Sequence, residues 1–183
     1  MKAVVLEKIG GPENLKLTSI DTPEPARGEV RIRLEASALN RRDYWITVGQ
    51  YPGIALPGVP GSDGAGVVDK TGEGVEASER GREVIVYPAR DWGGDPRAQG
   101  PGFRVLGMPD QGTFAEYICV PAGEYCAKPG YLSFEEAAAI PVGGLTSWRA
   151  VTTQAGVDNG QRVLVTGAGG GVATFAILWC VHL

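Results

Sequence analysis

The sequence lacks the features of several large classes of protein. Its three cysteines, Cys119, Cys126 and Cys180, are too few and too scattered for the disulfide framework of a small secreted domain. It has no basic excess either, because 17 Lys and Arg face 21 Asp and Glu, which gives a formal net charge of -4. Binding to the phosphates of nucleic acid therefore has little electrostatic support, and we expect no nucleic-acid partner.

Long apolar runs are also missing. No stretch approaches the roughly 18 apolar residues of a membrane-spanning helix. The first residues, Met1 to Lys8, reach charged sequence too early to supply the apolar region of a signal peptide. We therefore expect a soluble, cytoplasmic protein in a reducing compartment, without a membrane partner.

Glycine and apolar residues are plentiful. The 28 glycines and 13 prolines are scattered without a period, which favours many turns between short strands. With 43% hydrophobic residues, a globular chain of 183 residues is expected to bury roughly 70% of its unfolded surface. The sequence therefore predicts a folded protein with a substantial core.

The first 125 residues have the patterns of a mainly β structure. Residues 29–39 alternate apolar and charged side chains, which is the period of a half-buried strand. Shorter segments of the same kind are 3–6, 15–20, 65–69, 84–87 and 113–120. Residues 40–48 contain few helix breakers and predict a short helix, whereas 88–112 predict a long polar loop.

The pattern changes near residue 130. Ser133 and Glu136 have the spacing of a capping box, which predicts a helix over 134–140. A second helix is expected over 145–154, followed by a turn at 158–160. Residues 162–166 then form an apolar run that predicts a buried strand.

A glycine-rich segment follows this expected strand. Backbone amides bind a pyrophosphate at a helix N-terminus only where no Cβ blocks the approach, so glycine is favoured there. The glycines fit the pattern G-x-x-G-x-x-A with Gly167, Gly170 and Ala173, and not the stricter G-x-G-x-x-G. A plain turn between a strand and a helix is the alternative. The candidate cofactor-binding residues are Gly167, Ala168, Gly169, Gly170, Gly171 and Val172.

Several motifs occur together in a fixed order. They are Asn40-Arg41-Arg42-Asp43, Gly49-Gln50-Tyr51, Pro60-Gly61-Ser62-Asp63-Gly64-Ala65-Gly66, Gly112-Thr113-Phe114-Ala115-Glu116-Tyr117, Gly143-Gly144-Leu145-Thr146 and the Gly167 segment. In this order they resemble the zinc-lacking quinone oxidoreductase and enoyl reductase branch of the medium-chain dehydrogenase/reductase superfamily.

The resemblance carries expectations for the fold. It implies a GroES-like β-barrel catalytic domain over residues 1–125 and, over 126–183, the start of an NAD(P)-binding Rossmann domain that this length of chain leaves incomplete. The fold class is then α+β and α/β combined. Intact members of the family form homodimers, and the cofactor implied is NADPH, with NADH as the alternative. The residue that separates the two would follow Leu183.

The positions of the zinc ligands differ from those of zinc-dependent relatives. Such relatives carry a Cys after the strong strand and a His-Glu pair in the next motif, whereas this chain has Asn40 and Ser62-Asp63. The loop over 88–112 contains no Cys or His, and the one histidine, His182, lies at the far end of the chain. Since zinc sites need three or four N, S or O side chains, we expect no metal.

The resemblance also suggests residues for reduction of a substrate without metal. Tyr51 matches a hydrogen-bond donor of related enoyl reductases, although it is equally well explained as a loop tyrosine on the barrel. Asn40 would bond to substrate or cofactor and Asp43 would orient neighbours, with helix capping as the alternative for both. Thr146 matches a family threonine beside the nicotinamide, or else bonds to its own helix backbone.

Two adjacent arginines lie in the first of these motifs. Arg41 and Arg42 would attract an anionic substrate, or else form a solvated charge pair. The sequence does not distinguish these two roles.

The function expected is therefore NAD(P)H-dependent reduction of a quinone, enone or related activated alkene or carbonyl, impaired in a chain of this length. Two other interpretations stay open, namely a non-catalytic GroES-like fragment or interaction module and a zinc-dependent alcohol dehydrogenase-like enzyme. The choice among a quinone, an enone, an enoyl thioester and a small aldehyde is not determined by these residues.

Overall fold

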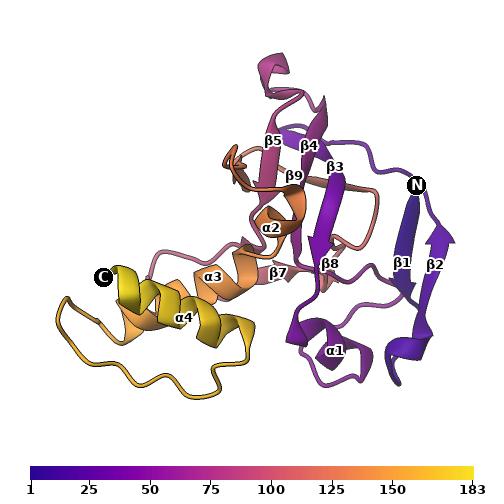
Figure 1. Cartoon of the computed structure of the whole chain (residues 1–183). Helices are drawn as coiled ribbons and strands as arrows, with labels where there is room; N and C mark the ends of the chain where they lie inside the picture. The colour runs from indigo at the N-terminus through magenta and orange to yellow at the C-terminus, as the bar shows by residue number, and fades with distance from the viewer.

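The computed structural model describes residues 1–183 and consists of a β-rich part and a helical part that lie side by side (Figure 1). The strands are β1 (Lys2–Leu6), β2 (Leu15–Ser19), β3 (Glu29–Ala38), β4 (Asp63–Thr71), β5 (Glu83–Val86), β6 (Ala89–Arg90), β7 (Arg104–Leu106), β8 (Pro109–Asp110), β9 (Tyr117–Pro121) and β10 (Tyr125–Ala127). The helices are α1 (Arg41–Thr47), α2 (Phe134–Ala138), α3 (Pro141–Trp148) and α4 (Gly171–His182), with short 3-10 turns η1 (Pro12–Asn14) and η2 (Ala77–Glu79) and a π-helical turn η3 (Arg149–Gln154).

A five-stranded antiparallel sheet forms the centre of the β-rich part, in the order β10-β5-β4-β3-β9. The alternation predicted for residues 29–39 is confirmed by β3, in which Val30 and Ile32 are fully buried and Arg33 is exposed. The main cluster of the core contains eight buried residues, Val30, Ile32, Val68, Val84, Val86, Leu106, Ile118 and Val120. Strand β3 holds the sheet together because it pairs with both β4 and β9.

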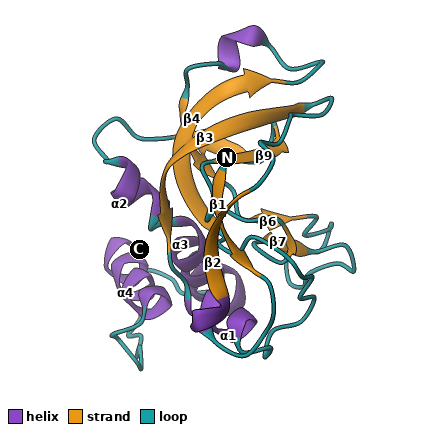
Figure 2. Ribbon diagram, turned by 90° about the vertical axis from the view of Figure 1, so that its right-hand side faces the viewer, coloured by secondary structure: helices purple, strands orange, loops and turns teal.

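Smaller sheets surround this centre, as the strands of Figure 2 show. Strands β1 and β2 form a hairpin, and single bridges from Ala3 to Ala115 and from Leu6 to Gly58 attach it to the rest of the barrel. Strands β6, β7 and β8 form a third sheet. The expectation of a long polar loop over 88–112 is therefore wrong at its two ends, where residues next to the core pair as short strands.

Three more expectations are corrected, two of them in the helical part. The second helix begins at Pro141 rather than Leu145 and ends in the π-helical turn. The strand expected over 162–166 is absent, since no other strand lies beside this segment to accept its hydrogen bonds, and Leu164 is 88% exposed. Strand β9 begins at Tyr117 rather than Thr113.

Helices α3 and α4 pack on each other through small and aromatic residues. Gly143 leaves room for the ring of Phe175, which would lie 3.0 Å from a Cβ added at this glycine. The indole Nε1 of Trp179 donates to the carbonyl of Gly144 at 3.3 Å and to Ser147 Oγ at 3.1 Å. The last helix is thereby attached to α3, the second helix after the barrel.

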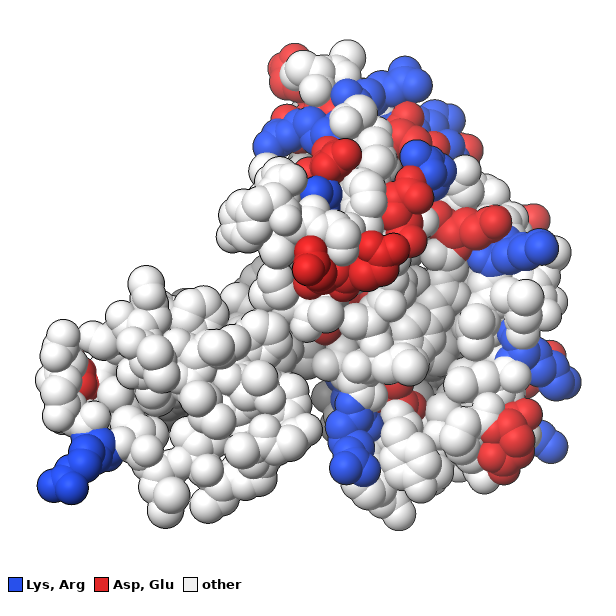
Figure 3. Space-filling model, in the orientation of Figure 1, with Lys and Arg blue, Asp and Glu red and all other residues white.

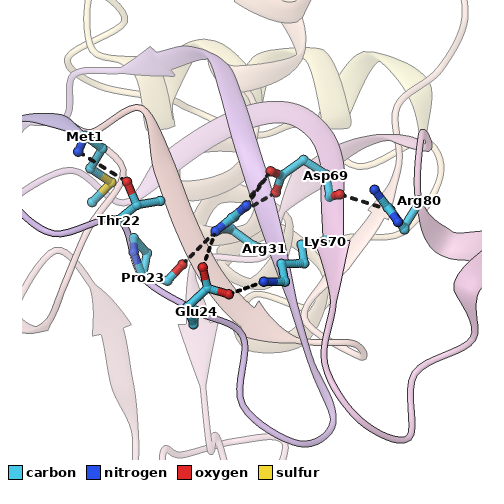
Figure 4. A network of polar contacts seen from close by, with 8 residues as sticks. All are labelled: Met1, Thr22, Pro23, Glu24, Arg31, Asp69, Lys70 and Arg80. Carbon is cyan, nitrogen blue, oxygen red and sulfur yellow. Dashed lines mark hydrogen bonds and ion pairs between the residues drawn. The ribbon is translucent and has the colours of Figure 1, made fainter.

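An ion-pair network outside the core fixes the segment between β2 and β3 (Figure 4). Arg31 of β3 donates to Asp69 of β4 at 2.8 and 3.0 Å and to Glu24 at 3.0 Å, and Glu24 also pairs with Lys70. The Arg31 side chain is only 14% exposed, so its charge is largely removed from water. This network therefore joins neighbouring strands of the barrel to the chain that approaches them.

The surfaces of the two parts differ in charge. Figure 3 shows acidic and basic side chains gathered over the barrel, whereas the face formed by α3 and α4 has almost none. Apolar side chains such as Leu178 and Val181 are exposed on α4, at 57% and 81%. No helix in the structure combines the length and the hydropathy needed to cross a membrane.

Candidate functional site

Asp63 joins three elements at the contact between the barrel and the helical part. Its Oδ2 accepts from Asn40 Nδ2, and its Oδ1 accepts from the backbone amide of Val142 in the first turn of α3, both at 2.9 Å. Its carbonyl accepts from Thr113 Oγ1 at 2.8 Å. The carboxylate thus satisfies one of the free amides at the start of a helix that is far away in sequence.

The electrostatic state of Asp63 follows from its burial. The residue is 1% exposed, and burial raises the pKa of its carboxyl from 3.8 to about 6. The hydrogen bonds from Asn40 and Val142 oppose this rise in pKa, while the negative charge of Asp43 adds to it. Burial also raises the pKa of Asp43 itself.

Arg42 lies beside this network and is 9% exposed. Its guanidinium donates to Ser62 Oγ and, at 2.6 Å, to the carbonyl of Leu106. It also lies over the ring of Tyr51, with 4.7 Å from Cζ to the ring centroid. The proposed solvated arginine pair is therefore wrong for Arg42, and only Arg41 is exposed.

A cavity of about 260 Å3 opens where the barrel meets α3. Four aromatic rings line it, and we call it the aromatic cavity; its lining consists of Arg42, Tyr51, Tyr87, Pro88, Ala89, Trp92, Phe103, Val105, Val142, Leu145, Thr146 and Arg149. Two sequence candidates, Tyr51 and Thr146, meet here from distant parts of the chain. A larger hollow of about 460 Å3 beside β1 and β9 contains none of the candidates, so we place the site at the aromatic cavity.

Asn40 and Asp43 lie outside the aromatic cavity. Asn40 is the residue before α1, and its backbone amide donates to Asp43 Oδ2 at 2.7 Å. Both residues border another hollow, next to Phe114. The geometry gives them capping and positioning contacts, and the catalytic role suggested for them stays a prediction.

The glycine segment forms a separate, exposed loop before α4. Gly170 is the residue before the helix, and its amide donates to the carbonyl of Gly167 at 3.1 Å. A Cβ added at Gly169 or Gly171 would meet nothing within 4 Å. The fold of this chain therefore gives no steric reason for glycine at those two positions, and the loop does not line the aromatic cavity.

Sequence reasoning missed several residues of the site. Trp92 and Phe103 come from the expected loop over 88–112. Arg149 lies within the helix expected over 145–154, but the contact of that helix with the loop was not predicted. Two aromatic residues within a polar, glycine-rich loop were the only available signal. The contact between Asp63 and the Val142 amide has no local pattern that indicates it.

Comparison with known proteins gives consistent matches. A family model described as "Alcohol dehydrogenase GroES-like domain" matches residues 26–130. "Zinc-type alcohol dehydrogenase-like protein YogA" of Leptosphaeria maculans is 38% identical over 181 residues, which cover 92% of this chain and 50% of that protein. "Quinone oxidoreductase" of Lama guanicoe is 33% identical over 178 residues, which cover 96% of this chain and 48% of that protein.

A solved structure agrees with these relatives. The crystal structure of an "NAD-dependent alcohol dehydrogenase" has a TM-score of 0.93 and 43% sequence identity, and the match covers 100% of this chain and 55% of that one. The chain spans about half the length of the curated relatives it matches. The expected GroES-like fold is confirmed, whereas the domain boundary at residue 125 stays a prediction. The family match over more than half of its residues shows that the protein belongs to the alcohol dehydrogenase GroES-like family, within the medium-chain dehydrogenases and reductases.

Proposed function

We propose that the protein serves in nicotinamide-dependent reduction of a quinone, enone or related activated carbonyl compound, and that it does so without catalytic zinc. The aromatic cavity carries this proposal, because it brings Tyr51 and Thr146, two residues with hydroxyl groups, to one largely apolar hollow. Pockets of this kind, apolar with a few converging polar groups, are typical of small-molecule sites. Relatives named as dehydrogenases and as a quinone oxidoreductase support the reaction class.

The side chains at the expected zinc positions do not fit the metal. Asn40 and Asp63 are already bonded to each other, and Ser62 Oγ accepts from the guanidinium of Arg42. A buried positive charge at hydrogen-bond distance from a would-be ligand opposes binding of a dication. No group of three His, Cys, Asp or Glu side chains is placed to hold a metal ion. We therefore derive no step through zinc.

The glycine loop fits a dinucleotide. Its glycines leave open space where side chains would otherwise project, and it precedes a twelve-residue helix whose first amides have no partner within the helix. Gly167, with φ of 67°, also needs glycine for its backbone conformation. When bound, a nicotinamide cofactor supplies a hydride. The resemblance favours NADPH, while two curated relatives and a solved structure are named NAD-dependent, so NADH is the alternative.

The side chains of the chain itself then hold the substrate and supply a proton. A hydroxyl such as that of Tyr51 would donate a hydrogen bond to the substrate oxygen, where negative charge would develop, and would supply the proton that the reduction requires. Arg42 fixes the ring of Tyr51 by lying over its face. Thr146 of α3 offers a second hydroxyl among the lining residues. Hydride and proton together complete a two-electron reduction.

The test is a titration of the protein with NADPH and with NADH, followed by nicotinamide fluorescence, with the zinc content measured on the same sample. We expect dissociation constants in the micromolar range and no stoichiometric zinc. Gly170→Ser is the matched variant, since serine is also favoured before a helix but adds a Cβ at the loop. It should abolish binding without lowering stability.

Gly123→Ser is the control, because a Cβ at Gly123 also meets open space, in a turn far from the loop in sequence. It should bind as the unaltered protein does. Equal binding by Gly170→Ser and Gly123→Ser would refute the assignment of the loop. No binding of either nucleotide by the unaltered protein would instead favour the non-catalytic GroES-like interpretation.

A further inference from the structure

The aromatic wall of the cavity is contributed by a loop with little packing of its own. Residues 93–99 are all exposed, and between Asp91 and Phe103 only Trp92, Gly100 and Phe103 are partly buried. Trp92 and Phe103 meet edge to face, with ring centroids 5.0 Å apart. Trp92 Nε1 is satisfied by the carbonyl of Asp95 at 2.9 Å, so the indole has no free donor. The loop therefore presents two aromatic surfaces but has few contacts that hold it in place.

Arg149, which follows α3, attaches this loop to the helical part. Its Cζ lies 4.0 Å from the centroid of a Trp92 ring. Its guanidinium donates to the carbonyl of Pro96 and, at 3.0 Å, to the carbonyl of Arg97. The planar guanidinium thus stacks on one loop residue and binds the backbone of two others, an arrangement that a lysine ammonium would not reproduce.

The π-helical turn explains how two of its residues, Arg149 and Gln154, both contact the loop. Gln154 Nε2 also donates to the carbonyl of Arg97, at 3.0 Å. In the π-helical turn the backbone bonds span five residues, as from the amide of Ala155 to the carbonyl of Ala150 at 3.0 Å. Because the turn is wider, Arg149 and Gln154, which are five residues apart, lie on the same side of the helix. Such turns occur frequently at functional sites.

We infer that Arg149 is a specificity-determining residue, which holds the Trp92 and Phe103 wall in place and thereby restricts the aromatic cavity to flat, conjugated ring substrates such as quinones. This inference rests on the proposed function and narrows its substrate class. At about 260 Å3 the cavity is slightly below the roughly 300–1,000 Å3 of typical ligand pockets, so it suits one or two fused rings. Aromatic walls favour a flat ring through stacked and edge contacts, which a tetrahedral alkyl group cannot make.

The test compares two probes by ligand-observed NMR titration, without turnover. The flat probe is 2,3-dimethyl-1,4-naphthoquinone, whose substituted ring carbons resist addition of the exposed Cys126 thiol. The branched probe is 3,3-dimethylbutan-2-one. We expect Arg149→Met to weaken binding of the quinone about tenfold, while binding of the branched ketone stays equal or improves. A purely structural role for Arg149 would reduce binding of both probes alike.

Three further variants complete the design. Gln154→Ala removes one loop contact from a residue outside the cavity lining and should weaken quinone binding by a smaller factor. Arg149→Lys retains the charge without the planar fork and should behave like Arg149→Met. Arg27→Met is the control, because this arginine is 80% exposed and its only ion pair, with Glu73, is 3.9 Å long.

The outcomes separate the inference from the proposed function. Unchanged selectivity in Arg149→Met, with NADPH binding intact, overturns the inference and leaves the proposed function standing. If Arg149→Met loses its selectivity for the quinone while NADPH binding stays intact, both the inference and the proposed function are supported. If the unaltered protein binds neither the quinone nor a nicotinamide nucleotide, the proposed function and the inference are refuted together.

Discussion

The substitution Asp63→Asn tests whether the contact between the barrel and α3 is held by a buried charge. The side chain keeps its shape, but one of the two accepting oxygens becomes an NH2 group that must face a donor, either Asn40 Nδ2 or the amide of Val142. A hydrogen bond to a charged acceptor is lost in either orientation. We expect this lost bond to cost about 2 kcal/mol at pH 7, where Asp63 is ionised in the folded protein.

The raised pKa of Asp63 has a second, pH-dependent effect. As the pH rises, it lowers the stability of the unaltered protein relative to Asp63→Asn. Burial raises the pKa of Asp63 from 3.8 in the unfolded chain to about 6 in the folded protein. The folded state therefore binds this proton more tightly than the unfolded state does. The stability contributed in this way is complete below pH 3.8 and is lost as the pH rises through about 6. The full change corresponds to about 3 kcal/mol, of which about 2 kcal/mol falls above pH 4.5.

The measurement is urea unfolding of both proteins at intervals from pH 4.5 to 7.5. The free energy of unfolding of the unaltered protein minus that of Asp63→Asn should fall by about 2 kcal/mol over this range. Because the charge of Asp43 contributes to the raised pKa, this change belongs to the interacting pair. A difference that stays level or rises with pH would refute the reasoning. Glu73→Gln, on an exposed ion pair, should shift stability by under about 0.5 kcal/mol.

Three further substitutions test the fold by urea unfolding at pH 7. Gly66→Ala should cost at least about 3 kcal/mol, because its Cβ would lie 2.1 Å from the carbonyl oxygen of Arg33 in the paired strand. Ser133→Ala should cost about 1 kcal/mol, since Ser133 Oγ accepts from the amide of Glu136 at 3.1 Å before α2. Arg31→Met should cost about 2 kcal/mol, because Asp69 loses its ion-pair partner while Glu24 keeps only Lys70.

The glycine and arginine substitutions each have a matched control. Gly123→Ala adds a Cβ in open space, and Arg27→Met removes an exposed guanidinium. Both should change the free energy of unfolding by less than about 0.5 kcal/mol. If a control lost as much stability as the variant it is compared with, the contact at Gly66 or Arg31 would not be the cause of that loss.

Local patterns in the sequence predicted the elements whose causes are local. The alternation along β3 predicted both the strand and its buried face. The spacing of Ser133 and Glu136 predicted a capped helix, and both bonds of the capping box are present. The helix over 40–48 was predicted because it contains few breakers, and α1 begins and ends within that range.

Elements whose causes lie far away in sequence were not predicted. The apolar run over 162–166 has the composition of a strand, but a strand also requires a neighbour with free backbone groups, and no such neighbour exists in the structure. Arg42 has the charge of a surface residue, but Ser62 and the carbonyl of Leu106 surround it. Neither outcome depends on the residues adjacent in the sequence.

The same distinction explains which parts of the candidate site were found. Tyr51 and Thr146 were suggested by motifs, whereas the cavity between them exists only because the barrel and α3 are held together. Asp63 provides one such attachment at the start of α3, and Arg149 provides another at its end. If both act on the same cavity wall, loss of either should alter its shape, and their effects on quinone binding should not be additive. The double variant Asp63→Asn with Arg149→Met therefore distinguishes one coupled wall from two independent contacts.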